Sequence, residues 1–447
     1  PKHLEDFITI GSKVLVPFGK MKKLEEAYVI KIKEKSNYEI KDIAKVEDII
    51  REDQIALAKW MATKYFTNVS DCIKLMLAPG TRNIDVQKRI KDKFINVVNL
   101  NKTTQEIEFD IQNKKIKSEK QKKILDFVKN NKNCTITEIE LATDCSRAIV
   151  NTLIKNGYLN VEEKKVKRNP LENKNVQKNE KLILTNEQAA AVEQVQHTIN
   201  NNEYKKFLLY GVTGSGKTEV YLQLIEEVLN NQKTAIVLVP EISLTPQMVD
   251  RFIARFGKNK IAVLHSKLSI GERHDEWERI KNDEVKIVIG ARSAIFAPLN
   301  NIGIIIIDEE HDSSYKSESN PRYDAKEIAY KIAQNFNCPV LLGSATPDVV
   351  TYYKTQIGEI KLLKLSKRAN NSSLPYVEVI DMKKELASGN RSMLSFKLYE
   401  MIKNNLKNKM QTILFLNRRG FSTFIMCREC GYRAKCKNCD ISLTYHR

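Results

Sequence analysis

The stretch FLLYGVTGSGKTEVYLQLIEEVLN, Phe207–Asn230, decides the fold of this chain. It runs from an apolar segment of strand length through a glycine-rich turn into an amphipathic helical pattern. The turn, Gly211–Thr218, fits the P-loop pattern G-x-x-x-x-G-K-[ST], and strand, turn and helix are the context that this pattern requires. Glycines allow backbone N–H groups to face phosphate oxygens, and the start of the helix adds its dipole. The sequence therefore predicts a nucleotide site.

Each side chain of this turn has an expected task. Lys217 neutralises the β- and γ-phosphates, and Thr218 is a ligand of Mg²⁺. Upstream, Gln188 in LTNEQAAAV (Leu184–Val192) is placed to read adenine. The predicted nucleotide contacts are Gln188, Gly211, Thr213, Gly214, Ser215, Gly216, Lys217 and Thr218.

A second motif, IIIIDEEHD at Ile304–Asp312, supplies two carboxylates at the end of another apolar segment. We expect Asp308 to hold Mg²⁺ and Glu309 to orient and deprotonate the attacking water, with Lys217 as the third catalytic residue. The motif GSAT (Gly343–Thr346) ends a further segment, and its hydroxyls could relay hydrogen bonds from the nucleotide site.

The repeated apolar segments define the fold class. FLLYG, TAIVLVP, IAVLHS, VKIVIGA, GIIIIDEE and PVLLGSAT alternate with amphipathic patterns, which is typical of a parallel sheet covered by helices. We predict a multidomain α/β protein with a RecA-like P-loop NTPase lobe at 183–370. YVEVIDM (Tyr376–Met382), a helix through Lys409 and TILFLNRRG (Thr412–Gly420) predict the start of a second lobe at 375–426.

Two smaller modules precede the lobe. Residues 1–105 combine the alternating segments Gly11–Lys20 and Ala27–Lys35 with a helical pattern at Asp53–Phe66, which predicts a small β-rich domain. Residues 113–168 predict three short helices followed by a hairpin-like strand pair after Asn156-Gly157, the layout of a winged helix. Residues 169–182 are interpreted as a linker.

Composition narrows the class of partner. The chain has 447 residues, 74 Lys and Arg against 55 Asp and Glu, and a net charge of +19. A surplus of this size suggests a polyanion such as nucleic acid, although scattered lysines from a coding bias would give the same number. No apolar run reaches the roughly 20 residues that span a bilayer. We expect no membrane partner.

Four of the eight cysteines crowd into two CxxC turns, which indicates metal binding rather than disulfides. Each turn directs two thiolates at a tetrahedral metal, so residues 427–447 are predicted to be part of a zinc-binding region. His446 is a conceivable further ligand, and the other four cysteines are expected to be buried. The predicted zinc ligands are Cys427, Cys430, Cys436 and Cys439.

Together these motifs resemble the PriA family of primosomal replication-restart helicases, in superfamily 2. The resemblance covers the chain from about Gly11, is densest over Leu184–Arg447, and is carried in order by GVTGSGKTEVYL, VPEISLTPQ, LHS, GARSAIFAP, DEEHDSSYK, PRY, GSATP and LFLNRRGF.

The resemblance implies an ATP-dependent 3′→5′ DNA helicase that recognises stalled or abandoned forks and promotes primosome assembly. The implied partners are forked and single-stranded DNA, single-stranded DNA-binding protein and helicase-loading proteins. A bacterial, cytoplasmic, nucleoid-associated monomer is expected.

The resemblance also suggests DNA contacts. In the loop from Asp312 to Tyr323, Tyr315 and Tyr323 would stack on bases, while Lys316 and Arg322 would pair with phosphates. Arg292 matches a position that faces the DNA track, with a structural salt bridge as the alternative. The first domain resembles the family's module for 3′ DNA ends, where Gly19 and Lys41 fall on matching positions.

The resemblance also implies zinc ligands and helicase motifs beyond those in this sequence. The family uses two zinc ions and four more cysteines, and its later motifs include an arginine that reaches the γ-phosphate. We therefore expect a chain truncated at both ends, with incomplete zinc sites, weak nucleotide binding and poor hydrolysis.

Two other functions remain open. The chain could be mainly a fork-recognition and loading scaffold in which the motor is accessory, as the basic stretch Asn113–Leu182 would allow. It could also be a duplex DNA translocase of the remodelling or restriction type. That class shares the core motifs but would not carry the SSYK and PRY loop followed by two CxxC turns.

Overall fold

The structure is a computed structural model. It describes residues 2–18, 24–33, 40–79, 93–172, 174–241, 243–369, 375–415, 430, 432–433 and 435–437. The chain divides into two compact units, Pro1–Ser372 and Ser373–Arg447.

A seven-stranded sheet is the centre of the first unit, and all its neighbouring strands are parallel. The strand order is β13-β7-β12-β11-β8-β10-β9. The bounds are β7 Lys206–Gly211, β8 Thr234–Leu238, β9 Ile261–Leu264, β10 Ile287–Gly290, β11 Ile302–Ile307, β12 Val340–Ser344 and β13 Lys361–Leu365.

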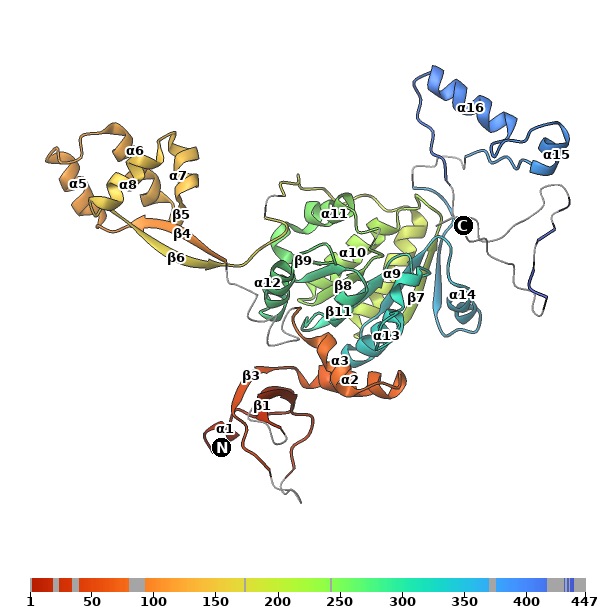
Figure 1. The fold of residues 1–447 in the computed structure, drawn as a ribbon, viewed down its shortest axis with the longest axis horizontal. Helices are drawn as coiled ribbons and strands as arrows, with labels where there is room; N and C mark the ends of the chain where they lie inside the picture. Colours follow the sequence, from red (N-terminus) through yellow and green to blue (C-terminus); the bar gives the residue numbers. More distant parts are fainter. Residues whose placement is uncertain are drawn as a thin grey trace. The chain divides into compact units, whose positions relative to one another are not determined.

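Helices cover both faces of this sheet, which is why its strands are apolar throughout (Figure 1). Successive residues alternate between the two cores: Ile304 and Ile306 of β11 face one, Ile305 and Ile307 the other. One face packs against α9 Asn186–Asn200, α10 Lys217–Asn230 and α11 Pro246–Phe256. The other packs against α12 Ile270–Lys281, η3 Arg292–Phe296 and α13 Ala325–Phe336.

The predicted α/β lobe is confirmed, and each of the six apolar segments contains a strand. The seventh strand, β13, was not predicted. Its sequence KLLKL exposes Lys361 and Lys364 and buries Leu363 and Leu365, as expected of an edge strand. The short helix α14 Val349–Gln356 precedes it.

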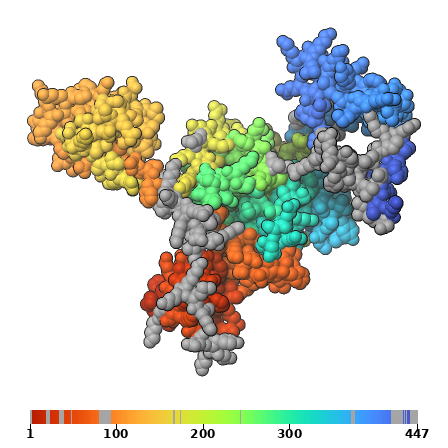
Figure 2. All heavy atoms as spheres, viewed as in Figure 1, coloured from red at the N-terminus to blue at the C-terminus, as the bar shows by residue number. Residues whose placement is uncertain are grey.

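The first domain contains an antiparallel sheet in the order β2-β1-β3. Its helix α2 was predicted, and the core of α2 continues into the face of the lobe that carries α13. The guanidinium of Arg51 donates hydrogen bonds to Leu299 O (2.8 Å) and Asn300 Oδ1 (2.6 Å) of the lobe. Figure 2 shows this helical part against the lobe. The bounds are α1 Lys2–Glu5, β1 Ser12–Pro17, β2 Leu24–Tyr28, β3 Lys45–Ile49, α2 Glu52–Lys64, α3 Val69–Ile73 and η1 Lys74–Met76.

The winged-helix prediction requires a correction. The three predicted helices are present, but the strand after them, β6, pairs antiparallel with β4, which precedes all of them. No hairpin follows Asn156-Gly157, and the module starts at Lys93 rather than at 113, because residues 93–100 complete its sheet. The bounds are β4 Lys93–Leu100, α5 Thr104–Gln112, α6 Glu119–Asn130, β5 Cys134–Thr135, α7 Ile136–Thr143, α8 Arg147–Lys155 and β6 Leu159–Val166.

The linker has no regular secondary structure over its described residues, and it is anchored to the lobe. Asn179 N donates to Ala254 O (2.9 Å), and Lys174 forms an ion pair with Asp250. The linker therefore forms part of the surface of the lobe.

The second unit contains two helices, α15 Met382–Ala387 and α16 Phe396–Lys407, in its described part. Tyr376–Met382 was predicted as a strand and is not one. A strand needs a hydrogen-bonded neighbour, and residues 375–415 contain none, so Val377 and Val379 are exposed. Thr412–Phe415 is likewise not a strand, and the rest of that prediction lies outside the described residues.

Cys72, Cys134, Cys145 and Cys338 are buried as expected. Among the described helices, none has the length and apolar character needed to cross a bilayer.

The shared core between α2 and the lobe leads to a stability prediction. Met61→Ala removes a fully buried side chain of α2 and should lower the stability of that core by about 2–5 kcal/mol. The two tryptophans, Trp60 and Trp277, both belong to this core, so fluorescence during urea unfolding measures it. Ile124→Ala, in the separate core of the winged helix, is the matched control and should leave the fluorescence midpoint unchanged. An unchanged midpoint for Met61→Ala would contradict a core shared by α2 and the lobe.

Candidate functional site

The candidate nucleotide site lies at the carboxyl edge of the sheet. The P-loop begins at the end of β7, the motif GSAT begins within the end of β12, and Asp308 follows β11; these three strands are adjacent in that order. Parallel strands end at one edge, so the three motifs converge. The sheet order therefore places Gly343 between the two predicted catalytic motifs.

The P-loop has the backbone that a phosphate cradle requires. Gly214 and Gly216 both have φ of +81°, a conformation that favours glycine. A Cβ on Gly211 would lie 2.5 Å from Ser215 Oγ, so a side chain there would fill the turn. Lys217 Nζ donates to Gly211 O (3.1 Å), and Ser215 Oγ is buried with no hydrogen-bond partner among the described residues. These groups fit a bound phosphate, which would accept from both.

Gln188 braces this loop. Its Nε2 donates to Ser215 O (2.7 Å), and its Oε1 accepts from Thr185 N (2.8 Å) in a capping box at the start of α9. The side chain is buried, and both ends of the amide are engaged. In this arrangement Gln188 supports the loop, and reading adenine would require it to exchange one of these bonds.

A segment after β13 also contacts the P-loop and was not predicted. Ala369 N donates to Gly214 O (3.0 Å). Glu187 accepts from the hydroxyl and the backbone N–H of Ser366, and these bonds lower the pKa of Glu187. No motif in the sequence indicates this contact.

Asp308 and Glu309 stand beside the P-loop as predicted. Burial raises the pKa of Asp308, while the Tyr221 hydroxyl, which donates to Asp308 Oδ1 (2.8 Å), and the Lys217 charge act against this rise. Burial and then the Asp308 charge raise the pKa of Glu309. A carboxylate pair beside a lysine is the donor set that Mg²⁺ and a nucleotide would use. Asp308 and Thr218 would hold the ion.

Tyr221 is a part of the site that the sequence reasoning missed. It lies on α10, is fully buried, and reaches Asp308 only because Gly343 has no side chain. A Cβ on Gly343 would lie 1.7 Å from Tyr221 Oη. The glycine of GSAT is therefore the signal that could have revealed this contact.

The rest of the DEEH motif ties neighbouring elements to the site. Glu310 is fully buried and accepts from Lys326 Nζ (2.9 Å), Thr351 Oγ1 (2.9 Å) and Asp348 N (2.7 Å), which joins α13 and α14 to β11. His311 lies with Nδ1 2.9 Å from Ser344 Oγ and Nε2 3.4 Å from Thr346 Oγ1. The carboxylate turn and GSAT are thus connected by hydrogen bonds.

Two of the expected DNA contacts are corrected by burial. Tyr315 is 1% exposed, and its hydroxyl donates to the backbone carbonyl of Asp308 (2.5 Å). Tyr323 is 4% exposed, and its ring lies edge-on to Phe296 at 5.0 Å between centroids. Neither ring presents a face to a base in this structure, whereas Lys316 and Arg322 are exposed.

Arg292 holds the loop rather than facing a free track. Its guanidinium donates to Ser314 O (3.1 Å) and to Lys316 O, and it lies 5.7 Å from the centre of the Tyr323 ring. Arg292 therefore has a structural role, as in the salt-bridge alternative, but its partners are backbone carbonyls and not a carboxylate.

The remaining predicted residues are less informative. Lys41 is exposed in the first domain, and Gly19 lies outside the described residues, as do Cys427 and Cys439. Cys430 is exposed and Cys436 half-buried. Within the described part of the chain no cluster of His, Cys, Asp or Glu is arranged to hold a metal.

The parallel sheet, the P-loop and the carboxylate pair define a RecA-like lobe of the helicase type. A family model for the type III restriction enzyme res subunit matches residues 181–349, and one for the PriA 3′ DNA-binding domain matches residues 1–78.

Curated relatives specify the family. The replication restart protein PriA of Bacillus subtilis is 41% identical, over 100% of this chain and 63% of the relative. That of Haemophilus influenzae is 37% identical, over 98% and 59%. The chain belongs to the PriA family, and it spans about three-fifths of the length of these two relatives.

Among solved structures, RecG bound to a three-way DNA junction is 19% identical over 51% of this chain and 32% of that chain. The TM-score of 0.32 is too low to compare the two folds in detail.

The contact between Gly343 and Tyr221 leads to a prediction of coupling. Gly343→Ala should destabilise the lobe by about 1–3 kcal/mol, because its Cβ displaces the Tyr221 hydroxyl from Asp308. Tyr221→Phe removes the hydroxyl and should recover part of this loss in the double variant. A double-mutant cycle from urea unfolding measures the coupling. Strictly additive effects would contradict the packing described here.

Proposed function

We propose that this chain carries the motor lobe and the fork-recognition modules of an ATP-dependent 3′→5′ DNA helicase for replication restart. The supporting observation is the convergence of Lys217, Asp308 and Glu309 at one edge of the sheet, with a loop bonded directly to Asp308. Bound ATP would supply the phosphoryl group, and the chain's residues position it and neutralise its charge.

The loop between Asp312 and Tyr323 is the element that would couple nucleotide to DNA. Tyr315 connects it to Asp308, and Arg292 fixes two of its carbonyls. A change in charge at Asp308 on binding Mg²⁺ would act on this loop through one hydrogen bond. The exposed cations Lys316 and Arg322 are our proposed phosphate contacts.

We assign the remaining DNA contacts to the N-terminal modules. Gly19 and Lys41 would bind a 3′ end, as the name of the matching family model suggests. The winged helix and linker carry 17 Lys and Arg against 9 Asp and Glu over 113–182, which favours a duplex arm as their ligand. Single-stranded DNA-binding protein and helicase loaders are the proposed protein partners.

Zinc belongs to the same proposal. The spacing Cys427-x2-Cys430-x5-Cys436-x2-Cys439 supports two half-sites for zinc ions.

A scaffold is the second candidate. The core shared by α2 and the ATP-binding lobe favours it, because this core joins a recognition module to the lobe without involving the nucleotide. The two functions differ in whether ATP hydrolysis is required.

Lys217→Ala tests the motor. In the complete protein, DNA-stimulated ATPase and unwinding should fall by at least about 100-fold, since the P-loop lysine neutralises phosphate charge, while fork binding stays within about twofold. Lys205→Ala, which removes a surface ion pair with Glu203, is the matched control and should keep wild-type activity. Unwinding that survives Lys217→Ala would refute the motor, and assembly of partner proteins by the same variant would support the scaffold.

A further inference from the structure

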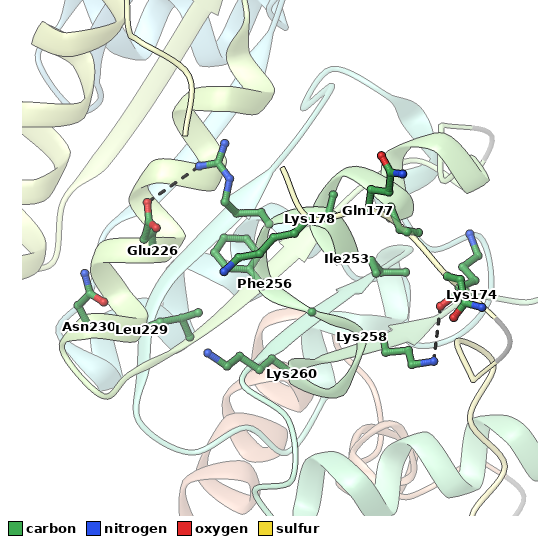
Figure 3. A pocket seen from close by; sticks show the side chains of 15 residues that line it. Lys174, Gln177, Lys178, Glu226, Leu229, Asn230, Ile253, Phe256, Lys258 and Lys260 are labelled. Atoms are coloured by element: carbon green, nitrogen blue, oxygen red, sulfur yellow. Dashed lines mark hydrogen bonds and ion pairs between the residues drawn. The ribbon is translucent and has the colours of Figure 1, made fainter. Parts of the chain in front are cut away.

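A second basic site lies away from the nucleotide. The linker, the carboxyl ends of α10 and α11, and the turn before β9 enclose an open pocket of about 730 Å³ (Figure 3). We call it the linker pocket. Its apolar floor includes Ile253, Phe256 and Leu229. The α10 helix begins at the P-loop and ends here, so the pocket is about 20 Å from the nucleotide site at 1.5 Å per residue.

The pocket contains more positive charge than its partners neutralise. It is lined by Lys174, Lys178, Arg255, Lys258 and Lys260, with Glu226 as the one carboxylate of the lining. Lys174 pairs with Asp250, and Arg255 pairs with Glu219 (3.0 Å) and, at 4.0 Å, with Glu226.

The other three lysines have no ion pair within the described part of the chain. Lys258 Nζ donates to Glu172 O (2.7 Å), which leaves its charge in place. In Figure 3, Lys178 and Lys260 both extend toward the helix that carries Leu229 and Asn230. Lys178, Lys258 and Lys260 therefore form a cationic cluster over an apolar floor.

Hydrogen bonds hold the linker against α11 at this pocket. Asn179 N donates to Ala254 O (2.9 Å), and Arg255 Nη2 donates to Glu180 O (3.2 Å), so both sides are held together. Arg255 Nε is a buried donor with no hydrogen-bond acceptor among the described residues, whereas Nη1 lies 4.0 Å from Glu226 Oε2 in an ion pair. An anion at this pocket would meet a wall held by hydrogen bonds, with lysine side chains around it.

We propose that the linker pocket binds the phosphates of a single strand of nucleic acid. The inference rests on the proposed function, since it takes DNA as the substrate. A compact triphosphate prefers backbone N–H groups at a helix start. Here α10 and α11 present their carboxyl ends, whose partial charge is negative. Singly charged phosphodiesters spaced along a strand suit lysines on flexible stems better.

The test compares two doubly substituted chains. Lys178→Glu/Lys260→Glu changes the pocket, and Lys361→Glu/Lys364→Glu makes the same charge change on β13, at the opposite edge of the sheet. Binding of a labelled oligothymidylate is measured over a salt series. The pocket variant should bind about tenfold more weakly at low salt, and its slope of log K against log salt should be shallower by about 1.4, because two phosphate contacts are lost.

The β13 control should bind within about twofold of the unsubstituted chain. Equal weakening of both variants, or no weakening, would overturn the proposal. Acetylation of lysines followed by mass spectrometry gives a second readout: the strand should protect Lys178, Lys258 and Lys260, and full reactivity of all three in the complex would refute direct contact.

Two outcomes separate this inference from the proposed function. If the unsubstituted chain binds no DNA, both fail. If it binds DNA and only the pocket substitutions have no effect, the pocket inference fails alone. Binding of a polyglutamate peptide that the pocket variant loses, with oligothymidylate binding unchanged, would overturn the proposal in favour of an acidic protein segment.

Discussion

The hydrogen bonds to Asp308 are the constraint on which the rest of the site depends. Its carboxylate accepts from Tyr221 on the P-loop helix, and its backbone carbonyl accepts from Tyr315 on the following loop. Both tyrosines are buried, so each hydroxyl needs a partner inside the protein. Gly343 makes the arrangement possible by leaving space for Tyr221. One residue thus connects the helix that follows the P-loop, the edge of the sheet and the loop.

Through these hydrogen bonds, a change at the candidate nucleotide site would reach the loop after Asp308 directly. Glu310 and His311 fix the neighbouring helices and GSAT around the same turn, and Arg292 fixes the far side of the loop. A hydrogen-bond network of this kind couples the positions of the elements that it joins. The aromatic residues of the loop then act inside the protein, as positioning groups, and its exposed cations remain available for phosphates.

Much of the lobe could be predicted from the sequence, because buried parallel strands and a P-loop have strong local patterns. The predictions that were wrong concern residues whose structure depends on tertiary partners. Tyr315 and Tyr323 lie in a loop whose composition is typical of one that stacks on bases. In the fold, Tyr323 packs against Phe296 and the Tyr315 hydroxyl bonds to Asp308, so both rings are buried. The strand Lys93–Leu100 joins the winged helix through a partner about 60 residues later, a pairing that no local pattern specifies. Val377 and Val379 alternate like a strand, but no neighbour in residues 375–415 pairs with them.

Hydrogen exchange of the loop amides tests the central claim most directly. Exchange over Ser313–Tyr323 would be followed with and without Mg²⁺ and a non-hydrolysable ATP analogue, in the unsubstituted chain and in Tyr315→Phe. We expect nucleotide to slow exchange in this loop severalfold in the unsubstituted chain and much less in Tyr315→Phe. Slowing confined to the P-loop and α10, with the loop unchanged, would contradict the coupling through Asp308.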